Sequence, residues 1–412
     1  MTAEYTSPHE YPKLRNIDGM PATDEQQGMI ILYDPSHLSD KTLLVPQDIL
    51  YTLQFLDGTH SLLDIRAEYM RAFGTFLFED RLSKLLHDLD ECLFLENNRY
   101  AEYMDGIRES FRKSPVRQSI FAGQSYPADA EELHSQLSNY FEAPEGPGLP
   151  DTDPERYSIK GLVAPHIDIH AGGFCYAHAY KALAEAEPAD LYVILGTCHA
   201  PMQRAYAATL KNFQTPFGTV ETDSEFISSL GKKFSYDLFE DELMHRTEHT
   251  IEFQLIFLQH ILKTEFTITP ILCSFSHEAL LPKSEQKNEI ELFCRNLRRA
   301  IQTHIGRVCV IASVDFSHVG PRYGDEQAPD ANFLSLVQRF DNDLLECLEL
   351  LDAESFTATL TSSGNRYRIC GFAPLYTLLK CIETNSGKLL NYSNARMDSS
   401  GSTVTFASMV FE

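Results

Sequence analysis

Three histidines follow three apolar segments of the sequence, each directly after a turn of small residues. GLVAPH ends at His166, LYVILGTCH ends at His199, and VCVIASVDFSH ends at His318, with Asp315 three residues earlier. If these segments are neighbouring parallel strands, their carboxyl ends meet at one sheet edge, which is where open α/β sheets bind ligands. Imidazole is a common metal ligand, acid and base. The pattern therefore predicts that at least two of these histidines share one functional site.

Two further segments contain candidate site residues. His170 follows His166 in HIDIH as a loop residue that could contact a metal. The segment MHRTEHTIEFQL has helical spacing, which would place Glu248 and Glu252 on one ridge. Two like charges on one ridge are unfavourable unless a nearby arginine, a solvated face or a pocket compensates. Glu248, His249 and Glu252 are therefore candidate pocket residues, and a solvated face is the alternative; the zinc-protease pattern H-E-x-x-H is absent.

Cys370 has the most distinctive setting of the nine cysteines, in the segment NRYRICGFAPLYTLLK. Gly371 permits close approach of the backbone, and Pro374 suits the first turn of a following helix. A thiol near a helix N-terminus and near Arg366 and Arg368 has a lowered pKa, and it can act as a metal ligand or as a nucleophile. A buried structural cysteine is the alternative. The cysteines are scattered without a C-x-x-C pair, which is typical of reduced thiols in a cytosol.

Charge and length restrict the class of protein. The chain has 412 residues and a formal net charge of −25. This charge disfavours nucleic acid and anionic membrane surfaces as partners, because both attract a positive face. No stretch is apolar enough to span a membrane, and the N-terminus lacks the apolar run of a signal peptide. We therefore expect a cytoplasmic protein of two domains without nucleic-acid or membrane partners.

The first part of the chain predicts a small α+β domain over residues 1–110. Amphipathic segments at 45–58, 59–74 and 79–100 indicate three helices, the last running into a short strand or hairpin. This order is typical of a winged-helix module, and it resembles PqqD-like peptide-recognition modules in its helix order and its DG-x-x-S turn. The acidic charge of this region favours docking of a peptide or domain over DNA binding. Residues 102–120 are interpreted as a charged linker.

The second part, residues 117–412, alternates short apolar segments with longer amphipathic ones. Such alternation predicts βαβ units whose helices cover both faces of the sheet. The expected fold is an α/β/α sandwich around a mostly parallel or mixed sheet.

From Arg117 to the C-terminus, the sequence resembles the Memo-like family, whose bacterial members include AmmeMemoRadiSam system protein B. The resemblance rests on eight motifs in order: IFAGQSYPADAEELHSQL, VAPHIDIHAGG with YAHAYKAL, VILGTCHAP, TPFGTV, TEHTIEFQL, ASVDFSH, RICGFAPL and LNYSNARMDSSGSTVTFAS. The family is similar in fold to class III extradiol dioxygenases, which hold a non-haem Fe(II) at a sheet edge.

This resemblance implies a single transition-metal ion held by His166, His199 and Cys370, with Asp315 and His318 as catalytic residues on its open side. Two imidazoles and one thiolate favour Fe(II), with copper or zinc as alternatives, over Mg(II). VAPHIDIH departs from the pattern of some members, which leaves open whether the second histidine of HIDIH assists or replaces the first.

Three functions are expected from this resemblance. The first is an iron- or copper-dependent oxidoreductase of dioxygenase type, acting on a small molecule or on a modified residue of a partner protein. The second is a non-catalytic adaptor that binds a peptide in the same pocket, and the third is a metal-dependent hydrolase. Radical-SAM and AMMECR-like proteins are the expected partners, by association with the system's name.

Overall fold

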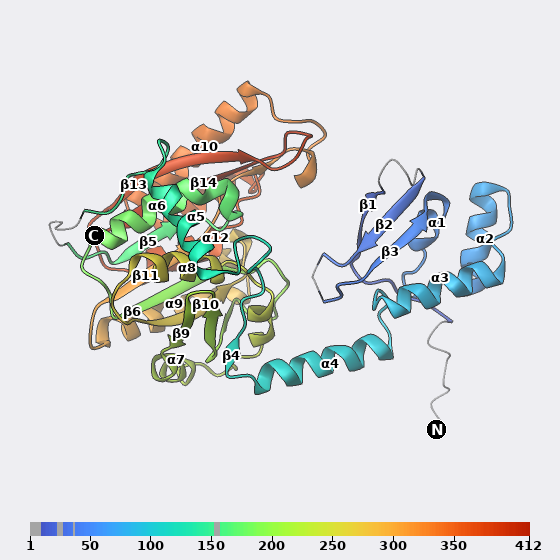
Figure 1. The fold of residues 1–412 in the computed structure, drawn as a ribbon, viewed down its shortest axis with the longest axis horizontal. Coiled ribbons are helices and arrows are strands. Elements are labelled where there is room, and N and C mark those ends of the chain that lie inside the picture. Colours follow the sequence, from blue (N-terminus) through green and yellow to red (C-terminus); the bar gives the residue numbers. More distant parts are fainter. Residues whose placement is uncertain (1–9, 23–27, 36–37, 152–156) are drawn as a thin grey trace. The chain divides into compact units, whose positions relative to one another are not determined.

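The computed structural model describes residues 10–22, 28–35, 38–151 and 157–412 (Figure 1). The chain divides into two units, Met1–Lys113 and Ser114–Glu412. Within the described ranges, no helix combines the length and the apolar character that crossing a bilayer requires.

The first unit packs helices against a three-stranded antiparallel sheet. The strands are β1 (Asp18–Pro21), β2 (Met29–Tyr33) and β3 (Thr42–Pro46), in the order β1-β2-β3. The helices are α1 (Gln47–Leu53), α2 (Leu62–Phe73), α3 (Glu79–Glu91) and α4 (Asn98–Lys113). Buried side chains of the sheet and of the first three helices form a separate core, which includes Leu32, Val45, Ile49, Ile65, Leu82 and Leu89.

The element order of this unit differs from the predicted winged-helix arrangement, which is not confirmed. The described strands precede the helices, because the apolar runs MIILY and TLLVP within the polar N-terminal region pair with each other. Residues 98–113 form α4, although most of this stretch was expected to be linker. Its charges pair along one exposed helix, as in Asp105–Arg108 and Glu109–Lys113, and such pairs stabilise a helix.

The second unit contains an eleven-stranded mixed sheet. The strand order is β12-β14-β5-β11-β6-β10-β9-β8-β4, with β13 paired to β14 and β7 paired to β10. The parallel centre consists of β5 (Gly161–Ala164), β11 (Val308–Ser313), β6 (Leu191–Thr197) and β10 (Thr267–Cys273). The flanking strands are β4 (Val116–Arg117), β7 (Tyr206–Ala208), β8 (Asn212–Thr215), β9 (Gly218–Thr222), β12 (His318–Val319), β13 (Gly387–Arg396) and β14 (Thr403–Phe411).

Helices cover both faces of this sheet, which confirms the predicted α/β sandwich (Figure 1). Successive residues of β6 point to opposite faces, so Tyr192 and Ile194 belong to one core, and Val193 and Leu195 belong to the other. On the Tyr192 side lie α5 (Ala130–Glu142), α6 (Ile169–Glu185) and α8 (Glu252–Ile261). On the Val193 side lie α7 (Ser224–Gly231), α9 (Gln286–Thr303), α10 (Ala331–Glu349), α11 (Ala353–Ser363) and α12 (Phe372–Cys381).

The three strands that precede the predicted site residues are direct neighbours in register. Ser313 at the end of β11 pairs with Ala164 at the end of β5 and with Gly196 near the end of β6. The chain segments that carry His166 and His199 therefore leave the sheet on either side of β11. The same register places the segment after β11, which carries the predicted Asp315, between them.

Asp341 on α10 ties this segment to the sheet. Its fully buried carboxylate accepts hydrogen bonds from Ser317 Oγ (2.6 Å), Thr405 Oγ1 (2.6 Å) and Tyr392 OH (2.7 Å). Burial raises the pKa of Asp341 to about 6, even though the three hydroxyl donors act to lower it.

We predict that Asp341 makes the second unit more stable in mild acid. Its folded pKa lies above the ordinary value of 3.8, so its contribution is fully present below about pH 4 and is lost as the pH rises through about 6. Across the whole titration, from about pH 3 to about pH 7, the unfolding free energy of the wild type should fall by about 3 kcal/mol more than that of Asp341→Asn. Denaturant unfolding followed by circular dichroism measures the difference, and parallel pH profiles would contradict it.

Candidate metal centre

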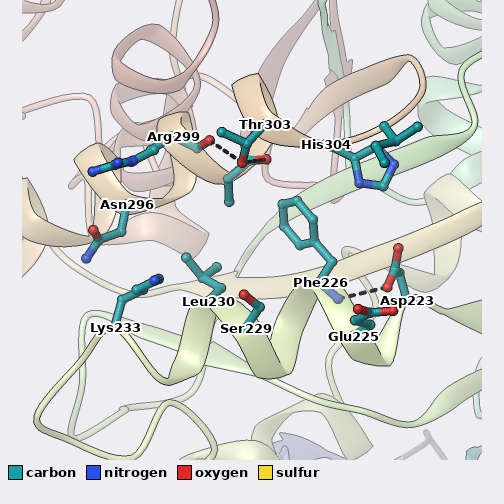
Figure 2. A pocket seen from close by; sticks show the side chains of 12 residues that line it. Asp223, Glu225, Phe226, Ser229, Leu230, Lys233, Asn296, Arg299, Thr303 and His304 are labelled. Atoms are coloured by element: carbon teal, nitrogen blue, oxygen red, sulfur yellow. Dashed lines mark hydrogen bonds between the residues drawn. The ribbon is translucent and has the colours of Figure 1, made fainter.

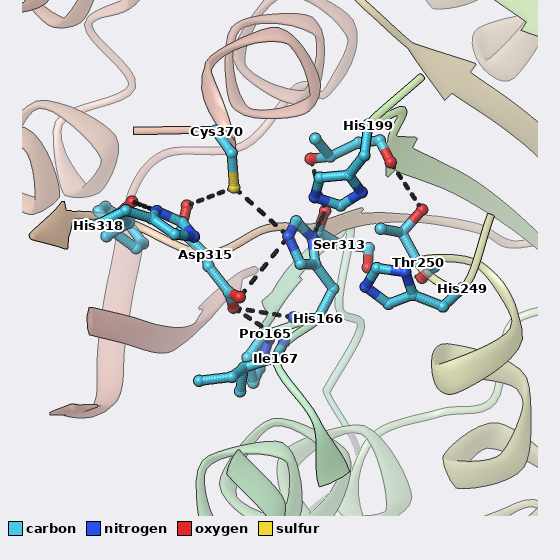
Figure 3. Close-up of polar contacts among 12 residues, drawn as sticks. Pro165, His166, Ile167, His199, His249, Thr250, Ser313, Asp315, His318 and Cys370 are labelled. Atoms are coloured by element: carbon cyan, nitrogen blue, oxygen red, sulfur yellow. Dashed lines mark hydrogen bonds and ion pairs between the residues drawn. The ribbon is translucent and has the colours of Figure 1, made fainter. Parts of the chain in front are cut away.

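Side chains from three distant segments meet at the carboxyl edge of the sheet (Figure 3). His166 follows β5, His199 follows β6, and Cys370 precedes α12. Their potential ligand atoms all lie within 4.8 Å of one another. His166 Nε2 is 3.4 Å from Cys370 Sγ, and the two imidazole rings meet edge to face with centroids 5.0 Å apart. The structure thus brings together the three ligands that the family resemblance implies.

His166 is held in one orientation and one tautomer. Its Nδ1 lies 3.0 Å from the carbonyl oxygen of Ser313, so Nδ1–H donates there and Nε2 keeps its lone pair toward Cys370. Burial lowers the pKa of His166, which favours the neutral imidazole. A neutral imidazole with a backbone-bound second nitrogen is the form that metal-binding histidines adopt.

Glu248 holds the second imidazole. His199 Nδ1 lies 3.1 Å from Glu248 Oε2, and the same oxygen accepts the backbone N–H of His199 at 2.9 Å. Glu248 Oε1 is also 3.0 Å from His249 Nδ1. Burial alone would raise the pKa of Glu248, but the two imidazoles hold this pKa well below its usual range. The ionised carboxylate therefore leaves Nε2 of His199 as the nitrogen available to a metal, which is the usual role of a carboxylate behind a ligating histidine.

Cys370 is placed by a close approach of two backbones. A Cβ atom on Gly371 would lie 2.5 Å from Val314 Cβ and 2.9 Å from the Asp315 carbonyl oxygen, so this position needs glycine. Burial acts to raise the pKa of the Cys370 thiol, but the imidazoles of His166 and His199 outweigh it and lower the pKa to about 7.

The cause of this lowered pKa differs from the sequence-based expectation. Arg366 and Arg368, which were expected to lower this pKa, interact with other residues. Arg368 forms an ion pair with Asp325 at 2.5 Å, and Arg366 lies over the ring of Tyr367 at 4.6 Å.

Asp315 clamps the turn that carries His166. Its Oδ1 accepts the backbone N–H groups of His166 at 3.0 Å and of Ile167 at 3.2 Å, and its Oδ2 lies 3.6 Å from His166 Nε2. Burial raises the pKa of Asp315, although His318 and the backbone donors act to lower it. These contacts make Asp315 a positioning residue for the turn.

Two further imidazoles flank the cluster. His249 stacks on His199 at 5.1 Å and meets His166 edge to face at 5.6 Å. His318 hydrogen-bonds through Nδ1 to the carbonyl oxygen of Phe316 at 3.0 Å, and burial lowers its pKa. Figure 3 shows His249 and His318 on opposite sides of Cys370.

His170 lies outside the cluster. Helix α6 begins at Ile169 with Asp168 as its N-cap, so the chain turns into a helix directly after the ligand segment. The exposed His170 has its Nδ1 3.4 Å from Gln136 Nε2. Among the described residues, it joins neither the cluster above nor the second group of potential metal ligands, which is His199, Glu248 and His249. Four residues of extended chain would have brought it to the same face as His166, but the helix turns it away.

Glu252 does not line the pocket, in contrast to the expectation from helical spacing. Residues 242–246 form a short 3-10 helix, and α8 begins only at Glu252, so Glu248 and Glu252 do not share a helical ridge. The fully buried carboxylate of Glu252 binds Arg117 and the hydroxyl of Tyr126, and it accepts the backbone N–H of Phe121 at 3.1 Å. The compensating cation is Arg117, which lies 135 residues earlier.

Gln254 is a scaffold residue that sequence reasoning missed. Its buried amide nitrogen donates to the carbonyl oxygen of Pro165 at 2.8 Å and to Ser313 Oγ at 2.7 Å, and its oxygen accepts from Tyr180 OH at 2.8 Å. One side chain of α8 therefore connects the ends of β5 and β11. The only sequence signal for this role is a polar residue within the otherwise apolar run FQLIFL.

The sequence of this chain is similar to those of known proteins. Residues 117–410 match the model of the family described as Memo-like protein. A MEMO1 family protein of Aquifex aeolicus is 29% identical over 403 residues, which cover 97% of this chain and 99% of the relative. A MEMO1 family protein of Methanopyrus kandleri is 34% identical over 306 residues, which cover 72% of this chain and 98% of the relative. A MEMO1 family protein of Methanosarcina barkeri is 30% identical over 283 residues, which cover 68% of this chain and 93% of the relative.

We predict that the buried Arg117–Glu252 pair is essential for stability of the second unit. Their side chains are 1% and 0% exposed, so Glu252→Gln leaves a buried guanidinium without its counter-charge. The unfolding free energy should fall by about 3–5 kcal/mol. The matched control is Glu383→Gln, which breaks the surface pair with Arg298, 53% and 46% exposed, and should cost at most about 1 kcal/mol. Urea unfolding measures both losses, and an equal loss of unfolding free energy in the two variants would contradict the prediction.

The thiol of Cys370 should be unusually reactive at neutral pH in metal-free protein. Its pKa of about 7 means that its alkylation rate rises through pH 7 and levels off above it, because the thiolate is the nucleophile. Cys347 is also half-buried, but burial raises the pKa of its thiol, so it should be alkylated more slowly than Cys370. Mass spectrometry after timed iodoacetamide treatment measures both sites. In His166→Gln, the midpoint for Cys370 should move upward; an unchanged midpoint would exclude the imidazole as the cause.

Proposed function

The chain belongs to the Memo-like protein family, and from this membership and its cluster of donors we propose a metal-dependent oxidoreductase. The proposed centre is one transition-metal ion bound by His166, His199 and Cys370. The observation that carries the proposal is the convergence of two oriented imidazoles and an acidified thiol within 4.8 Å.

The chemistry of the donors decides which metals fit. Two imidazoles and one thiolate suit iron, copper and zinc, whereas magnesium prefers an all-oxygen environment. We propose Fe(II) as the resident ion, with copper or zinc as alternatives. A redox-active ion with coordination positions left open supplies electron transfer and dioxygen chemistry of the extradiol-dioxygenase type.

The surrounding residues are proposed to prepare the site for such chemistry. Ser313 and Glu248 hold the second nitrogens of the two ligand histidines, and Asp315 fixes the turn that carries His166. His318, whose lowered pKa favours the neutral form, is proposed to accept a proton from a bound small molecule. His249, bound to Glu248, is proposed to orient the same molecule from the other side.

Metal content tests this proposal directly. Wild-type protein purified anaerobically should carry about one equivalent of transition metal per chain, measured by elemental analysis. His166→Ala and Cys370→Ala should lose most of this metal, because each removes one of three ligands. His170→Ala is the matched control, since this exposed histidine lies outside the cluster, and it should keep the metal. No metal in the wild type, or unchanged content in the two ligand variants, would refute the centre.

The type of reaction is distinguished in the same preparations. Iron-loaded protein should consume dioxygen in the presence of catechol-type compounds, and His318→Ala should slow the uptake while keeping the metal. Hydrolysis of esters by the zinc-loaded protein without oxygen uptake would favour the hydrolase instead. Metal binding without either reaction would favour a pocket that only binds peptides.

A further inference from the structure

A groove of about 440 Å³ lies between α7 and α9, away from the metal centre (Figure 2). Thr303 and His304, at the end of α9, line one part of this groove. Strand β11 begins shortly after them, at Val308. This is the amino edge of the parallel strands, whereas His166 and His199 lie at their carboxyl edge. Six residues of β11 separate the two edges by roughly 20 Å. The groove is therefore a separate site.

The floor of the groove is apolar. Phe226 and Leu230 on α7 are buried, and Ala300 on α9 faces them. Ile305 at the rim is 96% exposed, which is unusual for a large aliphatic side chain. Together these side chains form a surface on which a hydrocarbon or aromatic body can bury apolar area.

The charged residues of the groove are separated by sign. Figure 2 shows Lys233 and Arg299 at one end with Asn296, and Asp223 and Glu225 at the other. No described residue forms an ion pair with Lys233 or Arg299, in a chain that carries a net charge of −25. Two unpaired cations, one just after α7 and one on α9, with an amide between them, form an anion-binding end.

We infer that this groove binds a small amphipathic anion, with its anionic group at Lys233 and Arg299 and its apolar body over Phe226 and Leu230. The volume is in the range of small-molecule sites, about 300–1,000 Å³. The acidic end, Asp223 and Glu225, repels a second negative group. The site therefore selects molecules that carry charge at one end only.

A fluorescent anion tests the site in the full-length protein. Anilinonaphthalene sulfonate has an aromatic body and one anionic group, and its emission rises on binding. The double variant Lys233→Gln/Arg299→Gln should bind it about tenfold more weakly. The matched control is Lys232→Gln/Arg295→Gln, which removes the same charge from exposed neighbours outside the groove and should bind within about twofold of the wild type. Ser229→Trp, which fills the groove without changing its charge, should also weaken binding.

The orientation of the ligand is tested by competition. Octanoate should displace the dye, whereas suberate, with a carboxylate at each end, should not. Glu225→Gln should allow suberate to compete. Equal binding of the dye by the two double variants, or no effect of Ser229→Trp, would overturn the site. Equal competition by octanoate and suberate in the wild type would overturn the selectivity for one charged end.

Discussion

The geometry of the His166, His199 and Cys370 cluster depends on the hydrogen bonds that the carbonyl oxygen of Ser313 accepts. This carbonyl ends the central strand β11 and receives His166 Nδ1 at 3.0 Å and Thr197 Oγ1 at 3.2 Å. One backbone atom thus sets the tautomer of one ligand and connects the ends of three neighbouring strands. Gln254 supports the same residue through Ser313 Oγ. Because the sheet register fixes Ser313, the fold itself orients the imidazole of His166 for the proposed metal centre.

Buried carboxylates perform the complementary task of holding loops. Asp315 binds backbone N–H groups of the His166 turn, Glu248 binds those of His199 and His249, and Glu252 binds that of Phe121. Asp341 binds the segment between β11 and β12 through Ser317. Not all acidic residues of the chain therefore lie on its solvated surface, because these four buried carboxylates hold the segments that form the site. Removing such a group leaves buried donors unsatisfied, which costs more than its hydrogen bonds contribute.

Hydrophobic periodicity and local motifs predicted those features of the second unit that depend on residues close together in the sequence. The apolar strands, their alternation with helices and the histidines at their carboxyl ends follow from such patterns, and the sheet order made the three strands neighbours. The local sequence also made Cys370 a candidate, with a structural cysteine as the alternative, and the family resemblance implied its role as a ligand. Its low pKa comes from imidazoles that no local motif places beside it. Glu252 was placed wrongly because its partner, Arg117, lies 135 residues away. The prediction that Glu248 and Glu252 share one helical ridge was wrong because the chain forms a 3-10 helix and a turn before α8.

Two imidazoles and the Cys370 thiolate are proposed to bind one metal ion. X-ray absorption spectroscopy of the zinc-loaded protein tests this claim most directly, because sulfur and nitrogen ligands differ in distance. We predict one sulfur ligand at about 2.3 Å together with nitrogen or oxygen ligands at about 2.0–2.1 Å, and loss of the sulfur signal in Cys370→Ser. A zinc environment without sulfur in the wild type, or one that Cys370→Ser leaves unchanged, would contradict the claim.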